Sequence, residues 1–414
     1  MRIGIVGAGI SGLVAAELLR REHDIMVFER DPEPGGHART VDLEVEGRRV
    51  PVDTGFVVYN ETTYPRFTRL LADLRVETRP TEMSFSVRCE RTGIEWSGTS
   101  LDTVFAQRAN LLRPSFLRML RDVVRFNRRA SKDLDEGRIG GSTLGEWLAR
   151  GGYSEPFRDL YLVPMGAAIW SSSPARMLEF PAATFVRFFR NHGLLTADGQ
   201  FTWRTVCGGS RRYVRALVDP FRDRIRTACA VHAVRRFDDR VEISSAEGTE
   251  CFDEVVMAVH ADAALALLAD PTPQERDVLG AFAYQTNDGV LHLDSRMLPR
   301  TTKARASWNY HRTLDDPERV AVTYDMTRLQ GLATAVPVCL TLNRCDAVAP
   351  DAVVGRASWR HPLFGPRTPE AQARYREIHA VRRTRYCGAY WFHGFHEDGV
   401  RSARVACGLE GAPP

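Results

Sequence analysis

The first sixty residues alternate between short apolar runs and glycine-containing turns. Residues 2–6 form an apolar run that predicts a buried strand, and residues 24–28 predict a second one. Between them, residues 13–20 place apolar side chains at helical spacing and predict a helix. The order strand, helix, strand is typical of an α/β fold with a parallel sheet.

The middle of the chain predicts a long amphipathic helix. Residues 114–130 begin with a proline, which is favoured at the first position of a helix. One face is largely apolar, and the other carries a row of arginines: Arg118, Arg121, Arg125, Arg128 and Arg129. Such a row is either a solvated charged face or a contact surface for anionic lipid headgroups, and the sequence leaves both readings open.

The second half of the chain contains further strands and ends in a helix. Residues 144–148 predict a short helix, and residues 160–204 are rich in aromatic side chains that indicate a core and part of an apolar cavity. A glycine-rich segment at 386–399 leads into a predicted C-terminal helix. Strands are predicted at 230–235, 241–243, 252–260, 290–293, 306–310, 320–324 and 338–342.

Composition narrows the function classes. The 414 residues carry a net charge of only +4, which does not indicate a dedicated nucleic-acid binder. No run of 18 apolar residues and no secretion signal occurs, so we expect a cytoplasmic protein, with contact to the inner face of the membrane as an open alternative. The eight cysteines form no Cys-x-x-Cys pair and the histidines no zinc pattern, so we expect no metal site. Of 56 basic residues, only Lys132 and Lys303 are lysine.

The chemistry begins directly after the first predicted strand. Gly7-Ala8-Gly9-Ile10-Ser11-Gly12 opens the first helix, and Glu29 follows the second strand. The three glycines permit a tight turn, close approach of a pyrophosphate and close helix–strand packing, in that order. The helix start supplies free N–H groups for phosphate, and Glu29 is placed to accept hydrogen bonds from ribose hydroxyls. This combination predicts a dinucleotide site.

Two further segments suggest which dinucleotide is bound. Arg30 to Thr40 contains Gly35, Gly36, His37 and Arg39, an extension like that of FAD-binding oxidoreductases, in which Arg39 can neutralise phosphate. Thr54, Gly55 and Phe56 form a small, polar loop suited to lie beneath a flavin ring. A simple nicotinamide-dependent dehydrogenase is the lesser alternative.

Taken together, the motifs give the chain a family resemblance. It resembles the FAD-dependent amine-oxidase-like oxidoreductases, and within them the bacterial subgroup similar to the flavoprotein domain of plant cyclopropane-fatty-acid synthases. The resemblance is carried by residues 7–12, 35–36, 53–56, 169–171, 191–193, 208–211, 307–310 and 394–399. It implies an α/β protein with a Rossmann-like FAD-binding domain of the amine oxidase and glutathione reductase type and an inserted α+β substrate domain. The implied ranges are 1–75, 205–275 and 380–414 for the FAD-binding domain, and 76–204 and 276–379 for the substrate domain, whose helical part spans about 100–160.

The resemblance also implies cofactor-binding residues. The adenosine and pyrophosphate half would be bound by Gly7, Gly9, Gly12, Glu29, Gly36 and Arg39, with Val231 meeting adenine through its backbone. The ribityl–flavin half would be touched by Gly388, Ala389, Glu397, Asp398, Gly399 and Val400. The expected FAD contacts also include Ile10, Ser11, Arg30, Gly35, His37, Thr54, Gly55, Phe56 and Ala258. Ala403 departs from the subgroup, which commonly has glycine there.

The implied reaction is hydride transfer from a substrate C–H to flavin N5. Classical amine oxidases place a lysine near N5, and the matching strand around 287–292 has none, so the sequence favours desaturation or oxidation of an acyl chain or lipid. Tyr390 and Trp391 are expected at the flavin face and Tyr310 at the cavity, while His393 and His396 are general-base candidates by residue type alone. The alternatives are an amine, carotenoid or porphyrin-type oxidase, or a non-catalytic FAD-binding partner of a lipid methyltransferase.

Overall fold

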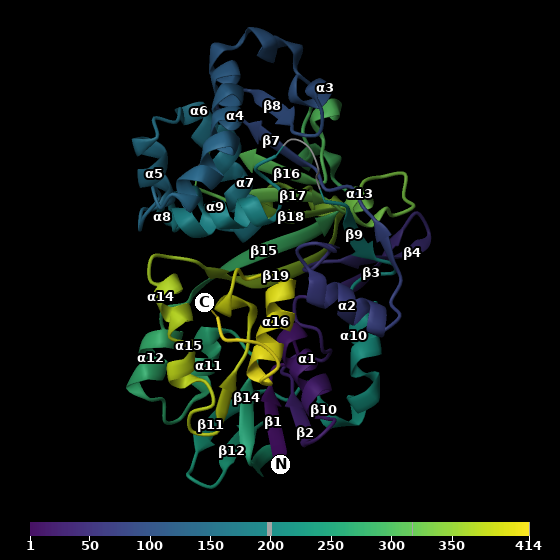
Figure 1. Ribbon diagram of the computed structural model, residues 1–414. Helices are drawn as coiled ribbons and strands as arrows, with labels where there is room; N and C mark the ends of the chain where they lie inside the picture. The colour runs from purple at the N-terminus through teal and green to yellow at the C-terminus, as the bar shows by residue number, and fades with distance from the viewer. Residues whose placement is uncertain (197–200, 317, 414) are drawn as a thin grey trace.

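The computed structural model describes residues 1–196, 201–316 and 318–413. Residues 197–200, 317 and 414, which fall inside the implied domain ranges, lie outside the described residues. The described chain forms two lobes, a lower one around a parallel sheet and an upper one around a large mixed sheet (Figure 1). This mixed α/β architecture confirms the expected fold class.

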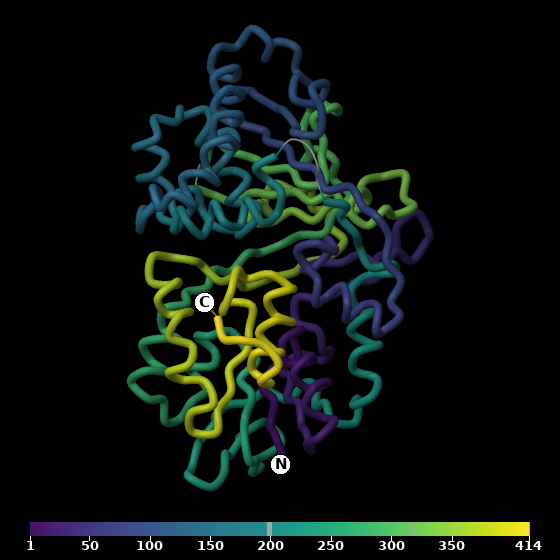
Figure 2. The backbone as a smooth tube through the Cα atoms, in the orientation of Figure 1, coloured from purple at the N-terminus to yellow at the C-terminus, as the bar shows by residue number. Residues whose placement is uncertain are grey.

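The lower lobe is built on a parallel sheet of short, buried strands. Its order is β10 (Ile225–Arg226), β2 (Asp24–Phe28), β1 (Arg2–Val6), β14 (Glu254–Met257) and β20 (Thr384–Tyr386). Strand β14 lies between the N-terminal strand β1, purple in Figure 2, and the C-terminal strand β20, yellow there, so segments far apart in sequence form one layer. The strands come from all three separate ranges that the resemblance assigns to the FAD-binding domain, whose borders stay a prediction.

Helices α1 (Ile10–Leu19), α10 (Arg211–Val218) and α16 (His396–Ala406) pack together in the lower lobe, and α1 follows the first glycine turn directly. Helix α1 begins three residues earlier than predicted and contacts both α10 and α16. Its Leu13, Ala15 and Ala16 are fully buried, since small and aliphatic side chains allow close helix–strand approach.

An antiparallel layer and four short helices complete the lower lobe. The strands are β11 (Val231–Arg236), β12 (Val241–Ser245) and β13 (Gly248–Phe252). The single strand predicted at 252–260 is wrong: Phe252 ends β13, and β14 begins at Glu254. Between them, the Asp253 carboxylate accepts a 2.6 Å hydrogen bond from the Arg2 N–H and holds the turn against β1. The helices are α11 (Ala261–Leu267), α12 (Pro273–Leu279), α14 (Thr368–Ala373) and α15 (Tyr375–Ile378).

The upper lobe contains a seven-stranded mixed sheet. In spatial order it comprises β19 (Val353–Leu363), β15 (Ala283–His292), β18 (Cys339–Leu342), β17 (Ala321–Asp325), β16 (Trp308–Arg312), β7 (Phe85–Cys89) and β8 (Ile94–Ser97). Four of these strands overlap predicted ones, whereas the eleven-residue β19 was not predicted because its side chains alternate between half-buried and exposed and form no apolar run.

Helices cover one side of the upper sheet. They are α3 (Leu101–Val104), α4 (Pro114–Asp135), α5 (Leu144–Arg150), α6 (Glu155–Phe157), α7 (Val163–Trp170), α8 (Pro174–Glu179) and α9 (Ala182–Asn191), with the 3-10 helix η1 (Arg108–Leu112) before α4. Helix α4 extends the predicted helix by more than a turn at its C-terminal end. Among the described residues, no helix is both long and apolar enough to cross a membrane.

Small elements connect the two lobes. A hairpin of β3 (Thr40–Val45) and β4 (Arg48–Asp53) lies beside a three-stranded sheet of β5 (Val58–Asn60), β9 (Trp203–Val206) and β6 (Thr78–Pro80). Helices α2 (Pro65–Asp73) and α13 (Met326–Gln330) are the remaining ones at this junction.

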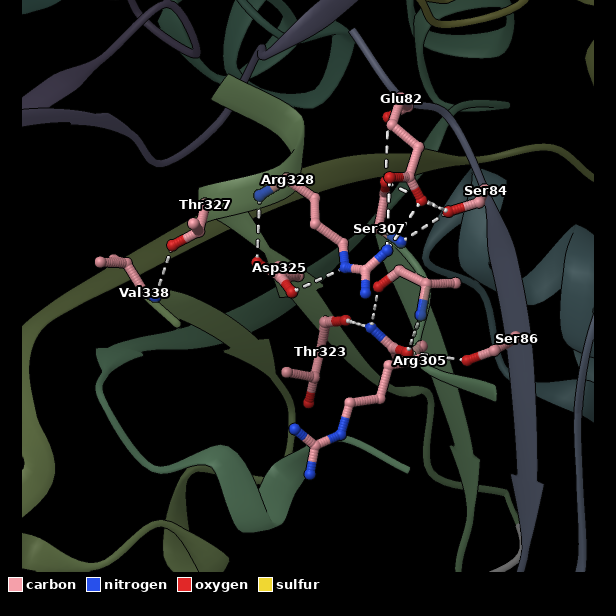
Figure 3. A network of polar contacts seen from close by, with 12 residues as sticks. Glu82, Ser84, Ser86, Arg305, Ser307, Thr323, Asp325, Thr327, Arg328 and Val338 are labelled. Atoms are coloured by element: carbon pink, nitrogen blue, oxygen red, sulfur yellow. Dashed lines mark hydrogen bonds and ion pairs between the residues drawn. The ribbon is translucent and has the colours of Figure 1, made fainter. Parts of the chain in front are cut away.

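A polar network fixes α13 to the upper sheet. Figure 3 shows the Arg328 guanidinium between Glu82 and Asp325, with Nη1 at 3.1 Å from Glu82 Oε1 and Nε at 3.3 Å from Asp325 Oδ2. Asp325 also caps α13 by accepting the Arg328 N–H, and the Ser307 N–H donates to the Ser84 hydroxyl across neighbouring strands.

The same helix bonds to the lower lobe through its last residue. The Gln330 amide donates to Asp53 Oδ2 at 3.1 Å and accepts the Asp53 N–H at 2.8 Å. Asp53 Oδ1 also accepts from the Thr40 hydroxyl and from the N–H and hydroxyl of Ser210. One buried carboxylate therefore joins three chain segments, and burial raises its pKa to about 6. It anchors the loop that follows, residues 54–56.

Candidate active site

A cavity of about 1760 Å³ runs from the first glycine turn to the helices of the upper lobe. Because pockets for single small ligands are usually about 300–1,000 Å³, this one has room for a dinucleotide together with a substrate. Most of the expected cofactor residues line it: Gly7, Gly9, Ile10, Ser11, Glu29, Arg30, Gly35, Gly36, His37, Arg39, Thr54, Gly55, Phe56, Val231, Ala258, Gly388 and Ala389, together with Tyr390.

The three glycines of the first turn have different surroundings. Gly7 adopts a φ of +100°, and a Cβ there would lie 2.7 Å from the Ala258 carbonyl oxygen. A Cβ at Gly12 would overlap the Gly7 carbonyl oxygen, so Gly12 serves the close packing of α1 against β1. Gly9 differs, since apart from its two chain neighbours no residue has an atom within 4 Å of the position of a Cβ, and Gly9 lines the cavity. The absence of a side chain at Gly9 therefore leaves space for a ligand, whereas at Gly7 and Gly12 it avoids a clash with other protein atoms.

The start of α1 and the end of β2 offer complementary hydrogen-bonding groups. Helix α1 has no side-chain cap, so its first N–H groups are available to an anion. The buried Glu29 carboxylate accepts the N–H groups of Ala8 at 2.8 Å and Asp31 at 2.9 Å. A carboxylate has about four lone-pair sites, so acceptor sites remain for ligand hydroxyls. Burial raises the pKa of Glu29.

A second glycine turn closes over the first. Gly35 (φ +127°) and Gly36 (φ +57°) use backbone conformations that favour glycine, and the Gly35 N–H donates to the Ala8 carbonyl at 2.8 Å. This turn directs His37 toward the cavity, where its ring centroid lies 6.1 Å from that of His260 and 4.8 Å from that of Trp359. Burial lowers the pKa values of His37 and His260 to about 4, so both rings are neutral near pH 7.

A chain of amide groups fixes the tautomer of a third histidine, His361 on β19. Asn343 accepts the Asp288 N–H with its oxygen and donates with its nitrogen, which orients its amide. It then donates to Asn287 Oδ1 at 2.8 Å, so Asn287 turns its NH₂ group toward His361 Nδ1 at 2.9 Å. Nδ1 therefore accepts, and the proton sits on Nε2.

The fixed tautomer defines what His361 offers to the cavity that it lines. Burial lowers the pKa of His361 to about 3, with a further contribution from the neighbouring His37 and His260. The ring is thus a neutral hydrogen-bond donor, suited to a ligand oxygen and poorly suited to accept a substrate proton.

The loop at 54–56 and the start of α16 form the adjoining part of the wall. The Phe56 N–H donates to the His37 carbonyl at 2.8 Å, and the Phe56 ring stacks on His396 at a centroid distance of 3.8 Å. His396 Nε2 lies 2.6 Å from the Tyr213 hydroxyl, and burial lowers its pKa to about 3. His393 also lines the cavity, with its pKa lowered to about 4 by burial. Both candidates for a general base are therefore weak bases near pH 7.

The acidic pair after His396 does not line the cavity. The Glu397 carboxylate accepts the Phe67 N–H at 2.9 Å and pairs with the Arg66 guanidinium at 3.1 Å, which caps α2. Asp398 accepts the N–H groups of Phe395 and His393 at the start of its own helix. Both carboxylates are therefore engaged within the protein, and a contact of residues 397 and 398 with the flavin stays a prediction.

Four other predicted residues also lie away from the cavity wall. Gly399 packs against α1, where a Cβ would lie 2.7 Å from the Ile10 side chain, and Val400 is buried beside it in the core of the lower lobe. Trp391 is fully buried, with its ring 4.7 Å from Tyr375. Tyr310 points under the helices of the upper lobe, two residues beyond Trp308, which does line the cavity.

Several cavity residues were missed by sequence reasoning, namely His260, Tyr284, Trp359 and His361. Trp359 and His361 lie at i and i+2 of β19, so an alternating reading of residues 353–363 could have placed both on one face. His260 and Tyr284 stack at 4.4 Å, a contact between two segments that has no local signal.

The fold and the glycine-lined cavity define a dinucleotide-binding oxidoreductase scaffold. The chain belongs to the flavin-containing amine oxidoreductase family, since the family model described as flavin containing amine oxidoreductase matches residues 10–290. A protein of Mycobacterium tuberculosis named as a flavin-containing monoamine oxidase, AofH, is 27% identical over 338 residues, which cover 78% of this chain and 70% of that protein.

Two solved structures with the same fold carry different names. Cyclohexylamine oxidase from Brevibacterium oxydans has a TM-score of 0.71 at 16% identity and covers 99% of this chain and 98% of its own. A fatty acid isomerase from P. acnes also has a TM-score of 0.71 at 16% identity and covers 99% of both chains. At such identity they show the fold alone.

Family membership makes the protein an FAD-dependent oxidoreductase, as the sequence motifs predict. The residues fit this cofactor because Gly9 leaves an open position beside the α1 start and Glu29 retains free acceptor sites. Gly9, Ser11 and Glu29 would hold its pyrophosphate and ribose, and the second glycine turn and residues 388–390 would border its remaining length. These individual contacts stay predictions.

Proposed function

We propose that this oxidoreductase removes a hydride from a C–H bond of an apolar substrate, an acyl chain or lipid, which also loses a proton to the medium and so gives a desaturated or oxidised product. Bound flavin supplies the hydride acceptor. The residues of this chain supply an apolar binding surface, exclude water and orient the chain that enters.

The distribution of charge in the cavity carries the proposal. Among the described lining residues, the acidic side chains are Glu29 and Asp31, both at the nucleotide end, and no lysine is present. The wall within the upper lobe is mostly apolar and aromatic, with uncharged polar side chains such as Asn127 and Thr99 among them: Phe85, Trp96, Val104, Leu120, Val123, Tyr161, Met165, Ile169, Leu194, Trp308, Tyr324 and Leu340. A substrate ammonium group would find no counter-ion there, and burying an unpaired charge is costly.

The two lysines support the same reading. Lys303 is exposed and pairs with Asp102 at 2.9 Å, and Lys132 is exposed on α4. Neither lines the cavity, so the lysine near N5 that the resemblance associates with amine oxidation has no equivalent among the described residues.

A second candidate is oxidation of a hydrophobic amine in its neutral form. It is favoured by the name of the Mycobacterium relative and by the cage of Trp and Tyr rings, which could hold an uncharged amine on an alkyl or cycloalkyl body.

The test is anaerobic reduction of the purified holoprotein by candidate substrates. A total lipid extract is expected to bleach the flavin absorbance at about 450 nm, and mass spectrometry of the lipids is expected to show a product lighter by two hydrogens. A panel of alkyl and cyclic amines is expected to leave the flavin oxidised. Reduction by the amines with no change from the lipids would replace the proposal by the second candidate.

A further inference from the structure

Helix α4 lines the cavity with one face and exposes another face to solvent. Leu120, Val123 and Asn127 line the cavity from one face. A separate exposed face carries Leu117, Arg121, Val124 and Arg128 at i, i+4, i+7 and i+11. The helix is thus both a wall of the cavity and part of the outer surface.

This outer face is strongly basic. Arg118, Arg128 and Arg129 are exposed and have no acidic partner within 4 Å among the described residues. Asp122, the acid within this stretch, is buried and accepts the Ser154 N–H at 3.0 Å. Arg121 and Arg125 approach this carboxylate at 4.0 and 3.4 Å, whereas the charges of Arg118, Arg128 and Arg129 are free to meet an external anion.

Exposed leucines lie in the short helices α3 and η1, which precede α4 in sequence. Leu111 and Leu112, in η1 directly before α4, are 49% and 88% exposed, and Leu101 at the start of α3 is 79% exposed. Leu117 and Val124 on the basic face are 43% and 50% exposed. Figure 1 shows this segment at the end of the molecule farthest from the N-terminus.

The cavity reaches the surface beside these leucines. Gly98 and Thr99 both line the cavity and are exposed, and they directly precede Ser100 and Leu101. Val104, on the same short helix as Leu101, also lines the cavity. One mouth of the cavity therefore opens at the edge of the leucine- and arginine-bearing surface.

We propose that this surface, defined by Leu101, Leu111, Leu112, Leu117, Arg118, Arg121, Val124, Arg128 and Arg129, docks on an anionic lipid bilayer and places the cavity mouth at the membrane. The arginines meet the headgroups, and the leucines enter the interface between headgroups and acyl chains. The inference goes beyond the proposed function and does not depend on it, because docking requires no turnover.

The combination of side chains favours a membrane over nucleic acid. A nucleic-acid surface relies on basic and polar contacts to phosphates and bases, and nothing in it requires five exposed aliphatic side chains. An interfacial membrane surface needs both a basic face and exposed apolar groups.

The test is co-sedimentation of the full-length holoprotein with vesicles. Vesicles of phosphatidylcholine with roughly one third phosphatidylglycerol are expected to bind the protein, and pure phosphatidylcholine vesicles to bind it weakly. Arg118→Gln, Arg121→Gln and Arg128→Gln combined should weaken binding about 100-fold, from about fivefold per arginine. Leu101→Ser with Leu112→Ser should weaken it at least about tenfold.

Matched controls separate the surface from overall charge and hydrophobicity. Arg49, Arg222 and Arg367 have side chains that are 83%, 69% and 65% exposed, and their combined change to Gln should leave binding unchanged. Leu314→Ser with Leu409→Ser, at 65% and 53% exposure, should do the same. Thermal unfolding of every variant checks that it folds.

A proximity measurement tests the position of the mouth. A tryptophan introduced as Thr99→Trp should add fluorescence that brominated lipids quench, whereas Leu409→Trp should add none that they quench. Absence of binding to anionic vesicles, binding by the triple arginine variant at the level of the unchanged protein, or duplex DNA that outcompetes the vesicles would each overturn the proposal.

Discussion

Comparing Gly9→Ala with Gly12→Ala distinguishes a glycine that is needed for ligand binding from one that is needed for folding. Gly9 has a φ of −73° and a ψ of 180°, which alanine adopts without strain, and apart from its two chain neighbours no other residue has an atom within 4 Å of the added methyl. The unfolding free energy of the apoprotein should therefore change by less than about 1 kcal/mol. The methyl instead enters the cavity at the start of α1, where the cofactor pyrophosphate is expected.

The expected loss of FAD affinity follows from steric crowding between the added methyl group and the cofactor pyrophosphate. Inserting a methyl group into a packed interface typically costs about 1–3 kcal/mol, which corresponds to an increase of about 5- to 150-fold in the Kd for FAD. Gly12→Ala is the matched control, because its methyl overlaps the Gly7 carbonyl oxygen. It should lower the stability of the apoprotein itself by about 1–3 kcal/mol or more.

The assay is titration of each apoprotein with FAD, followed by flavin fluorescence, together with urea unfolding of the apoprotein. The reasoning is refuted if Gly9→Ala binds FAD as tightly as the unchanged protein, or if it destabilises the apoprotein as much as Gly12→Ala does.

Three further predictions follow from the site. Burial raises the pKa of Asp53 to about 6, so the stability that its protonated form supplies is present below about pH 4 and is lost as the pH rises through about 6. Asparagine does not ionise, so urea unfolding should show the free energy of unfolding of Asp53→Asn rising relative to that of the unchanged protein over this range, by up to about 3 kcal/mol. Asn287→Asp places a carboxylate beside His361 Nδ1, so the pKa of His361 should rise from about 3 toward its ordinary value in NMR titration. Glu397→Ala leaves the buried Phe67 N–H without its acceptor and should cost about 1–3 kcal/mol of stability while leaving FAD affinity unchanged.

Each of these has an outcome that would contradict it. If the difference in unfolding free energy between Asp53→Asn and the unchanged protein did not change between pH 4 and 6, the titration of Asp53 would not be linked to stability. An unchanged titration of His361 would show that the amide chain does not control it. A large loss of FAD affinity in Glu397→Ala would instead support the cofactor contact that the family resemblance implies.

The sequence predicted the elements that have a strong local pattern. The first strand, helix and strand, the glycine turn and the arginine-bearing helix all carry either an apolar period or a glycine spacing that determines their form. Strand β19 carries neither, because its exposure alternates between half-buried and exposed positions along an edge of the sheet. The strand predicted at 252–260 runs across the end of β13 and beyond β14, because the turn at Asp253 depends on a contact with Arg2, which is distant in sequence.

The site was predictable where one motif builds it and not where several segments meet. Residues 7–12 and 35–37 form their turns locally, and the structure brings them together as expected. The positions of Glu397 and Asp398 were not predictable, because backbone N–H groups of α2 and of the turn before α16 compete for their carboxylates. The histidine cluster combines residues from a loop, from the N-cap of α11 and from β19, which no single pattern connects.

The most direct test of the central claim compares two substrates and two neighbouring side chains of α4. Val123 lines the cavity and Val124 faces solvent, and the assay uses a medium-chain acyl ester and a primary amine of equal chain length, without vesicles. We expect the ester to reduce the flavin anaerobically and the amine to leave it oxidised. Val123→Asp should slow reduction by the ester about tenfold or more, whereas Val124→Asp should leave it unchanged. Faster reduction by the amine than by the ester in the unchanged protein, or equal effects of the two substitutions, would contradict an apolar, uncharged substrate site.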